Sequence, residues 1–579
     1  MSLITHIGED EIARTGVDEG TLRRIAAKHN IEIPVYDIPG YLALLRSADL
    51  TTSAVDDLPD FIDSRLTPLP TQGGVRRFRK SAENCLNAWS HGTDLVAETP
   101  SSSLLRGRSV VVKDNISVGG VPFTCGTFPQ LNSGRQEHPP SAIDASVVRR
   151  LLDSGARIIG TATCENYSLS TLSYSSASGP VHNPWQRSFN AGGSSSGPAS
   201  LLGLRLARAA GVQGLEDAGA DVDLAIGGDQ AGSIRIPASY CGLYGLKPTH
   251  GLVPYTGIAG LHPMIDHVGP MALKLDDIAA LLEALAGDDG MDGRMTPNTP
   301  LRDNVTPYLS ELRAFSAAGA GTGRPLRVGV IVESLAAPQA TEEVARVVRR
   351  AVYQHFSAAG AMVADVSMPL HLLGPSIWTA SCRNNMGFLG IGARVPDMLT
   401  HNLPHWTPRW PPDQEMFDLL TRSNPAVMSV IFGETFLGEK FGPAVQAKAH
   451  RHVFQLREAY DELLAKFDVL ITPTTPDVAP PHPDMRAVQD GGWTVLDKAE
   501  LGLGVSSNTC AFNATGHPAL SVPCGWATAR DGFTKLPVGM QIIGRRWDDL
   551  GVLKAARVFE TGGGGLGPRP GVGVPRFVL

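Results

Sequence analysis

Basic tracts are missing from this sequence of 579 residues, in which 57 acidic side chains outnumber 50 basic ones. A formal net charge of -7 without a lysine- or arginine-rich segment gives no electrostatic footprint for nucleic acid or for a membrane surface. No apolar run reaches the length of a membrane span, and the N-terminus lacks the basic and apolar regions of a secretory signal. We therefore expect a cytoplasmic protein that binds neither nucleic acid nor a membrane.

Motifs for metal and phosphate binding are also missing. The sequence has no H-E-x-x-H motif, no C-x-x-C pair and no phosphate-loop lysine after its serine run. Its seven cysteines are scattered and odd in number, which is typical of small buried side chains in a reducing compartment. They are Cys85, Cys125, Cys164, Cys241, Cys382, Cys510 and Cys524. We expect no metal and no organic cofactor.

Hydrophobic periodicity divides the chain into a helical beginning and a long α/β part. Up to about residue 80, segments 9–30 and 39–50 have apolar residues at helical spacing. From about residue 107, apolar strands alternate with amphipathic helices, which predicts a three-layer α/β architecture. The expected buried strands are 108–116, 157–162, 223–228, 326–332, 361–368, 467–473, 519–523 and 538–544. The expected helices are 144–156, with Asp144 as its N-cap, 341–360 and 548–560.

A third kind of segment, residues 369–465, is mostly helical in pattern and rich in aromatic side chains. These include Trp378, Trp406, Trp410, Phe417, Phe432 and Phe436. We predict a helical cap with its own small core, which could also line a pocket for an apolar substrate. The expected organisation is a helical N-terminal extension (1–80), a main domain (81–560) that contains the cap, and a Gly/Pro-rich tail (561–579).

Three consecutive serines, Ser194 to Ser196, lie between glycines in the stretch NAGGSSSGPAS. Runs of glycine and serine are usually flexible linkers, so a linker is the first hypothesis. Residues 193–197 also match G-x-S-x-G, the nucleophile elbow of α/β-hydrolases, which requires an apolar strand directly before it. The preceding residues, NPWQRSFNAG, do not have the pattern of a buried strand, and we reject the elbow.

Downstream, strand 223–228 runs into a glycine-rich turn that presents Ser233 after Ala231 and Gly232. Small residues before a serine allow backbone N–H groups to point at a substrate oxygen, as in an oxyanion hole. Asp229 and Arg235 flank this turn, and we interpret them as a structural ion pair that supports the loop.

Lys113 stands alone near the end of the apolar strand 108–116. A lysine at a strand end is usually solvated. Burial would lower the pKa of its ammonium group, and a neutral lysine can act as a base. The Gly/Ser loop, the Ser233 turn and Lys113 could therefore converge on one site.

Together these segments resemble the amidase signature family. Its three marks occur in its order, as Lys113 in VVVKDN, GGSSSG at 192–197 and GGDQAGSIRIPA at 227–238. The similarity runs from about residue 105 to 290 and resumes at FDVLITPTTP and GHPALSVPCG. ASGPVHNPW and GLVPYTGI are most similar to broad-specificity amidases associated with nitrile hydratases. The resemblance implies a three-layer α/β/α fold around a central, twisted, mixed sheet.

The resemblance also implies a Ser–cisSer–Lys triad without a cofactor. Ser233 matches the acyl-enzyme nucleophile, Ser194 the bridging serine after a cis peptide bond, and Lys113 the base. Gly193 eases the crowding at that bond. The implied oxyanion hole consists of the backbone N–H groups of Gln230, Ala231, Gly232 and Ser233. The implied reaction is hydrolysis of small-molecule amides, with anilides, esters or carbamates as further substrates.

Alternatives to a free-standing amidase stay open. One is a component of an amidotransferase complex, which would need partner subunits; another is a non-catalytic binding scaffold. The helical N-terminus argues against the first, and the presence of all three triad residues argues against the second. A homodimer also stays open. The interval from Ser194 to Ser233 is longer than is usual in the family, and we expect residues 204–219 to form a peripheral insertion.

Overall fold

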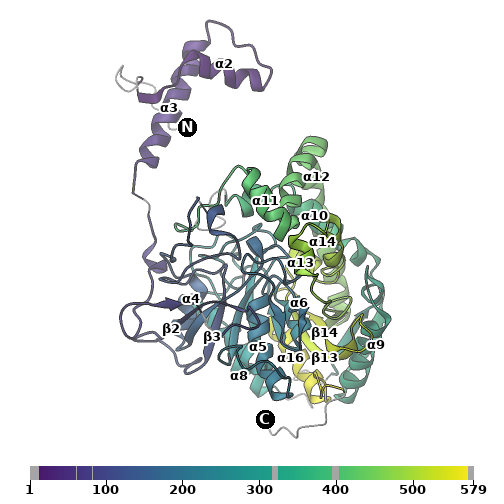
Figure 1. Cartoon of the computed structure of the whole chain (residues 1–579). Helices are drawn as coiled ribbons and strands as arrows, with labels where there is room; N and C mark the ends of the chain where they lie inside the picture. Colours follow the sequence, from purple (N-terminus) through teal and green to yellow (C-terminus); the bar gives the residue numbers. More distant parts are fainter. Residues whose placement is uncertain are drawn as a thin grey trace. The chain divides into compact units, whose positions relative to one another are not determined.

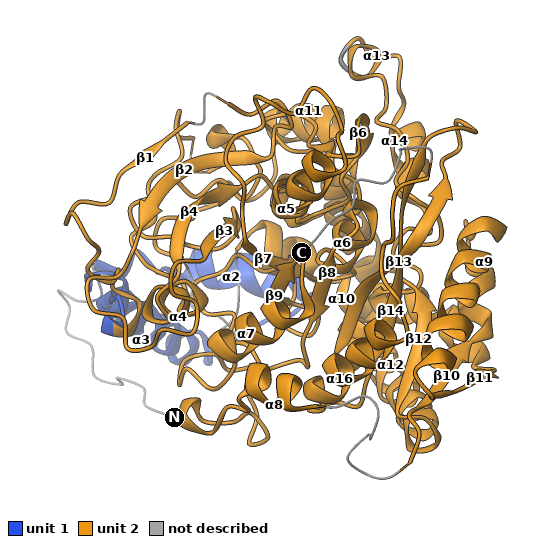
Figure 2. Cartoon of the chain, turned by 90° about the horizontal axis from the view of Figure 1, so that it is seen from below, with its two compact units in different colours: residues 1–64 blue, residues 65–579 orange. Residues whose placement is uncertain are grey.

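The computed structural model describes residue 12 and residues 14–59, 61–80, 83–132, 134–315, 324–393 and 403–570. The chain divides into two compact units, Met1–Ser64 and Arg65–Leu579 (Figure 2). Within these described ranges, no helix is both long enough and apolar enough to cross a membrane.

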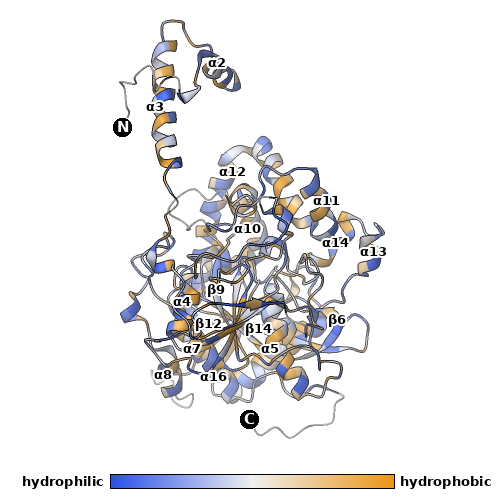
Figure 3. Cartoon of the chain, turned by 60° about the vertical axis from the view of Figure 1, so that its left-hand side comes forward, coloured by the Kyte–Doolittle hydropathy of each residue, from blue (hydrophilic) through white to orange (hydrophobic). Residues whose placement is uncertain are grey.

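The first unit contains helices α2 (Glu19–Lys28) and α3 (Ile38–Asp56), which contact each other. Helix α2 begins where the carboxylate of Asp18 accepts a hydrogen bond from the N–H of Thr21, an N-cap that satisfies a free donor of the first turn. Hydrophobic and hydrophilic residues both occur along α3 (Figure 3). The N-terminal part of the predicted helix 9–30 lies largely outside the described residues.

The second unit is built on a sheet that has twelve strands among the described residues, in the order β1-β2-β4-β3-β7-β9-β8-β13-β14-β12-β10-β11. The strands are β1 (Phe78–Arg79), β2 (Trp89–Leu95), β3 (Ser109–Lys113), β4 (Arg157–Ala162), β7 (Leu224–Asp229), β8 (Tyr244–Lys247), β9 (His267–Ala272), β10 (Arg327–Ile331), β11 (Met362–Val366), β12 (Val469–Pro473), β13 (Ala519–Thr528) and β14 (Lys535–Ile543). Strand β3 is parallel to β4 and β7, whereas β9 is antiparallel to β7, so the sheet is mixed.

Two groups of helices enclose this sheet (Figures 1 and 2). One group consists of α4 (Ser146–Asp153), α7 (Leu275–Leu285), α8 (Tyr308–Ala314) and α16 (Asp549–Thr561), in which α7 contacts the other three helices. The other contains α5 (Ser196–Ala209) and α6 (Arg235–Cys241), which also pack together. Helix α9 (Glu342–Ala351) contacts β13 and β14. The predicted three-layer α/β/α fold with a mixed central sheet is confirmed.

The region 369–465 contains α10 (Gly374–Cys382), α11 (Gln414–Ser423) and α12 (Pro425–Lys466). Helix α12 departs from helical geometry at Gly442, which has a φ of 62° and precedes Pro443. These helices contribute to a separate apolar cluster that includes Trp406, Met416 and Val427. Short helices α13 (Met485–Gln489), α14 (Val495–Gly502) and α15 (Cys510–Thr515) follow β12. Residues 394–402 of the predicted cap and 571–579 of the predicted tail lie outside the described residues.

Two local predictions were wrong. Strand β11 is not buried, because it lies at the edge of the sheet and three of its five residues are exposed. Asp144 does not cap α4, whose N-cap position is Ala145. The Asp144 carboxylate is instead buried against Arg76, at 2.6 Å, and accepts a hydrogen bond from the N–H of Gly119 at 2.8 Å. A distant arginine therefore competes successfully with the local helix N-terminus for this side chain.

The extra residues between Ser194 and Ser233 lie at the C-terminal end of α5 and directly after it. Helix α5 has 14 residues, so its C-terminus is roughly 20 Å along the axis from the serine loop. The segment that follows α5 is partly buried. Leu215 and Ala218 are buried, and the carbonyl of Asp217 accepts a hydrogen bond from the N–H of Cys85. The insertion therefore packs on the segment before β2 and is more than an exposed turn.

Candidate active site

Parallel strands bring Lys113 and the Ser233 turn to the same edge of the sheet. Strands β3 and β7 pair in parallel, with Val110 opposite Leu224, so their carboxyl ends lie side by side. Lys113 is the last residue of β3, and the turn 230–233 directly follows β7. Ligand and catalytic sites of α/β sheets commonly occur at the carboxyl ends of strands. The topology thus explains why residues 120 positions apart in the sequence lie at the same edge of the sheet.

Each of the three consecutive serines has a different hydrogen-bond partner. The Oγ of Ser194 accepts a hydrogen bond from Lys113 Nζ at 2.8 Å, and the peptide bond between Gly193 and Ser194 is cis. The Oγ of Ser195 donates to the carbonyl of Gly228 at 3.1 Å, and its N–H donates to the carbonyl of Ser233 at 3.1 Å. The Oγ of Ser196 donates to Glu165. All three are fully buried, and the linker hypothesis is therefore wrong.

Lys113 is fully buried, with 0% of its surface exposed. Burial is the largest influence on its ammonium group and lowers the pKa, because the charged form loses its hydration. The nearby carboxylates of Asp229 and Glu165 oppose this effect. The thiols of Cys125 and Cys164 also lie near, but burial raises the pKa of Cys125 to about 12 and that of Cys164 well above its usual value. Lys113 therefore has the environment that the base hypothesis requires.

The turn that presents Ser233 is held by hydrogen bonds to its carbonyl groups. Trp378 Nε1 donates to the carbonyl of Gln230 at 3.0 Å, and the hydroxyl of Thr509 donates to the carbonyl of Ala231 at 2.5 Å. Because a trans peptide directs its N–H away from its C=O, these bonds fix the directions of the following N–H groups. The N–H of Gly232 donates to Asp229 Oδ1 at 2.7 Å, so this donor is engaged within the protein. Ser233 itself is 6% exposed.

Asp229 and Arg235 form the predicted ion pair, and both side chains are fully buried. The guanidinium donates two hydrogen bonds of 2.9 Å to the carboxylate, and it also donates to Gln541 at 2.5 Å and Asn513 at 2.6 Å. Burial alone would raise the pKa of Asp229, but Arg235, Asn513 and Lys247 together outweigh burial and hold the pKa at about 2. The carboxylate therefore stays charged and anchors the N–H groups of Gly232 and Ile234.

Removal of Arg235 is expected to destabilise the protein strongly. In Arg235→Met, Asp229 would be left as a buried, unpaired charge, which costs about 3–5 kcal/mol of unfolding free energy. Urea unfolding measures this loss. The matched control is Arg349→Met, which breaks the exposed pair with Asp365 and should cost less than about 1 kcal/mol. A loss below about 1 kcal/mol for Arg235→Met would contradict the structural interpretation of this pair.

Sequence reasoning missed several residues that contact the site. Thr509 and Asn513 come from distant elements, and Trp378 was expected only as one of the aromatic residues of the cap. Glu165 alone had a local signal, because it closely follows the strand next to β3. Among the residues that the structure describes, no cluster of three or more His, Cys, Asp or Glu side chains could hold a metal ion.

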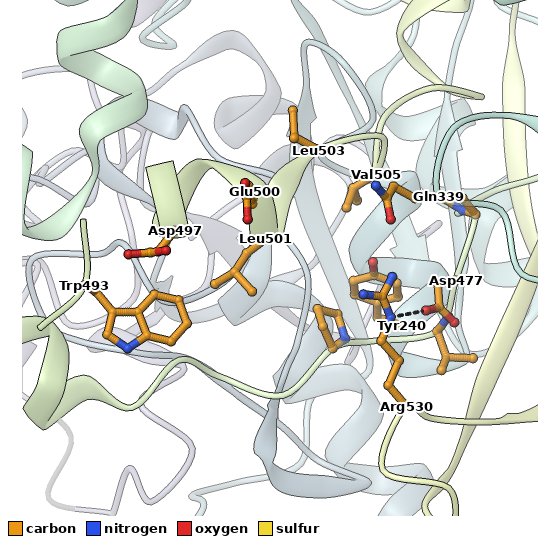
Figure 4. A pocket seen from close by; sticks show the side chains of 13 residues that line it. Tyr240, Gln339, Asp477, Trp493, Asp497, Glu500, Leu501, Leu503, Val505 and Arg530 are labelled. Carbon is orange, nitrogen blue, oxygen red and sulfur yellow. Dashed lines mark hydrogen bonds and ion pairs between the residues drawn. The ribbon is translucent and has the colours of Figure 1, made fainter. Parts of the chain in front are cut away.

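A separate cavity of about 500 Å³ lies beside the C-terminal end of α6 (Figure 4). Tyr240, Trp493 and Leu501 contribute to its lining, and Arg530 pairs there with Asp477 at 2.9 Å. Lys113, Ser194 and Ser233 are not among the residues that line it. This cavity is therefore distinct from the candidate active site.

Comparison with known proteins identifies the family. The family model described as Amidase matches residues 78–553. An enantioselective amidase from Rhodococcus rhodochrous is 35% identical over 492 residues, which cover 83% of this chain and 84% of that protein. A glutamyl-tRNA(Gln) amidotransferase subunit from Exiguobacterium sibiricum is 31% identical over 483 residues, covering 82% and 87%. The structure of a peptide amidase from Stenotrophomonas maltophilia aligns with a TM-score of 0.55 and 25% identity, covering 80% and 84%.

The chain therefore belongs to the amidase family and is an amidase, a hydrolase that acts on amides.

Proposed function

We propose that the chain hydrolyses carboxylic acid amides through an acyl-enzyme on Ser233. Ser233 Oγ attacks the carbonyl carbon while its proton passes through Ser194 to Lys113. The C–N bond then breaks, and the same proton returns through Ser194 to the leaving amine. Water, activated by the same relay, attacks the acyl-enzyme and releases the acid and free Ser233. The observation that carries this proposal is the 2.8 Å hydrogen bond between Lys113 Nζ and Ser194 Oγ, both fully buried.

We propose that the N–H groups of Gln230, Ala231 and Ser233 donate hydrogen bonds to the substrate carbonyl oxygen and stabilise the negative charge that develops on it. The peptide carbonyls that precede these three N–H groups, those of Asp229, Gln230 and Gly232, are each held by a hydrogen bond. The donors are Asn513 Nδ2, Trp378 Nε1 and the N–H of Ile236, respectively. Donors oriented in advance stabilise an oxyanion without reorganisation, which supports this placement. Gly232 would join the set only if its N–H left the carboxylate of Asp229.

The acyl group of the substrate is proposed to be largely apolar. Cys125 and Tyr167 belong to the same apolar cluster as Trp406 and Met416 of the cap region, and Cys125 lies near Lys113. An acyl group that lay against this cluster would contact mainly hydrocarbon and aromatic side chains, which bind apolar groups better than polar ones. Esters, anilides and carbamates share the acyl transition state and are expected to react as well.

The relative named as part of an amidotransferase supports one alternative, in which the chain releases ammonia from glutamine within a larger complex. The cytoplasmic location, the homodimer and the division into extension, catalytic domain, cap and tail remain our proposals.

A panel of substrates tests the function. The purified chain alone is expected to hydrolyse apolar aliphatic and aromatic amides at least tenfold faster, in kcat/KM, than glutamine. Release of acid and amine is measured by liquid chromatography for amides, anilides, esters and carbamates with matched acyl groups. Glutamine turnover that exceeds the others, or that appears only with added partner subunits, would favour the amidotransferase alternative.

A further inference from the structure

We propose that Glu165 is a positioning residue of this amidase: its carboxylate supports the loop that carries Ser194 and controls the protonation of Lys113. The inference rests on the function proposed above, because it takes Lys113 to be the base. Glu165 lies three residues after Ala162, the residue of β4 that pairs with Lys113 of β3. The parallel register of these two strands thus places the carboxyl group at the same edge of the sheet as the lysine.

Glu165 is fully buried, with 0% exposure, and its carboxylate accepts three hydrogen bonds. The Oγ of Ser196 donates to Oε1 at 2.8 Å, while the N–H and Oγ of Ser175 donate to Oε2 at 2.8 and 2.6 Å. Ser196 is the first residue of α5, so one oxygen is tied to the start of the helix that follows Ser194. These bonds account for the third serine of the run, which the triad does not use.

The same side chain packs against the residue before Ser194. A Cβ atom built on Gly193 would lie 3.1 Å from Glu165 Cγ, closer than nearly all ordinary contacts. It would also lie 2.7 Å from the carbonyl oxygen of Ser170. Glycine at 193 is therefore needed for the loop to lie directly on the Glu165 side chain. The chain of contacts runs from Glu165 through Gly193 and Ser194 to Lys113.

Four acidic groups act electrostatically on Lys113, namely Glu165, Asp229, Cys125 and Cys164, and Glu165 differs in charge from the other three. Asp229 is neutralised by Arg235, and the thiols of Cys125 and Cys164 are uncharged near neutral pH because burial raises their pKa values. All three hydrogen bonds to Glu165 come from uncharged donors. An ionised Glu165, three residues beyond the end of β4, therefore acts on Lys113 with a negative charge that these donors do not neutralise.

The two groups oppose the effect of burial on each other. Burial raises the pKa of Glu165 to about 7, although the hydrogen bonds and Lys113 act in the other direction. Burial lowers the pKa of Lys113, and ionised Glu165 counteracts this because it favours the ammonium. Each ionised group therefore favours the charged form of the other. Loss of the negative charge would let Lys113 release its proton at a lower pH.

Glu165→Gln tests this inference, since it keeps the size of the side chain and removes the charge. The acid limb of kcat/KM against pH is expected to move to lower pH by up to about one unit, the low end of the effect of a neighbouring opposite charge. Glu165→Asp, which restores the charge, is expected to return the limb toward the wild-type pH. The matched control is Glu333→Gln, because Glu333 also accepts bonds from a serine hydroxyl and a backbone N–H and has no contact with the triad.

An acid limb of Glu165→Gln at the wild-type pH, with only a lower plateau, would overturn the inference and leave a structural role. If that variant does not fold, Ser196→Ala decides: loss of one donor raises the pKa of Glu165, so the limb should again move to lower pH. An acid limb of Ser196→Ala that stays at the wild-type pH or moves to higher pH counts against the proposal. Lys113→Met is measured in parallel, because wild-type turnover in that variant would overturn the proposed function itself.

Discussion

Replacement of Ser233 by alanine is expected to abolish amide hydrolysis, with a loss of at least about 10⁴-fold in kcat. The variant lacks the oxygen that we propose forms the acyl bond, whereas the anchored turn around it depends on backbone contacts and should persist. Wild-type protein treated with a fluorophosphonate should gain one label on Ser233, measured by mass spectrometry of its peptides. The variant should gain none.

A second buried serine provides the control for this experiment. Ser200 lies on α5, and its hydroxyl donates to the carbonyl of His182 at 2.7 Å, away from the triad. Ser200→Ala should retain both turnover and labelling. Labelling of Ser195 in place of Ser233 would contradict the proposal and would revive the nucleophile elbow.

The predictable part of this protein is the part with local signals. Strand β3 could be predicted because three consecutive valines precede Lys113, and the Ser233 turn because two small residues follow a buried strand. The three-layer fold follows from the alternation of such strands with helices. The type of reaction could be predicted from three short motifs, because they occur in the order that one family has.

The parts that could not be predicted depend on contacts between distant residues. The bond from Trp378 to Gln230 spans 148 positions, and nothing in the aromatic pattern of the cap distinguishes Trp378 from its neighbours. Asp144 has the type and position of an N-cap, yet Arg76, 68 positions away, engages it instead. Burial of Lys113 could not be predicted from the sequence, because it depends on the contact between the serine loop and the end of β3.

Removal of the amine of Lys113 is expected to have the second largest effect, because it ends the proposed proton relay. Lys113→Met keeps an unbranched side chain in the buried position and should lower amide kcat/KM by about 10²–10⁴-fold, the usual contribution of a general base. Activated esters should lose less, because their leaving groups depart without a proton. The remaining activity should no longer rise with pH where the wild type does, since that limb is proposed to report deprotonation of Lys113.

The matched control for this prediction is Lys498→Met. Lys498 is also largely buried, with its ammonium bonded to the carbonyls of Thr421 and Arg422, and burial also lowers its pKa. Its replacement removes a buried amine that the relay does not use, so the pH profile should stay that of the wild type. Turnover is measured from about pH 5 to 10 on an amide and an activated ester with the same acyl group. Equal losses on both substrates in Lys113→Met, with an unchanged acid limb, would mean that the lysine only supports Ser194 and that another group accepts the proton.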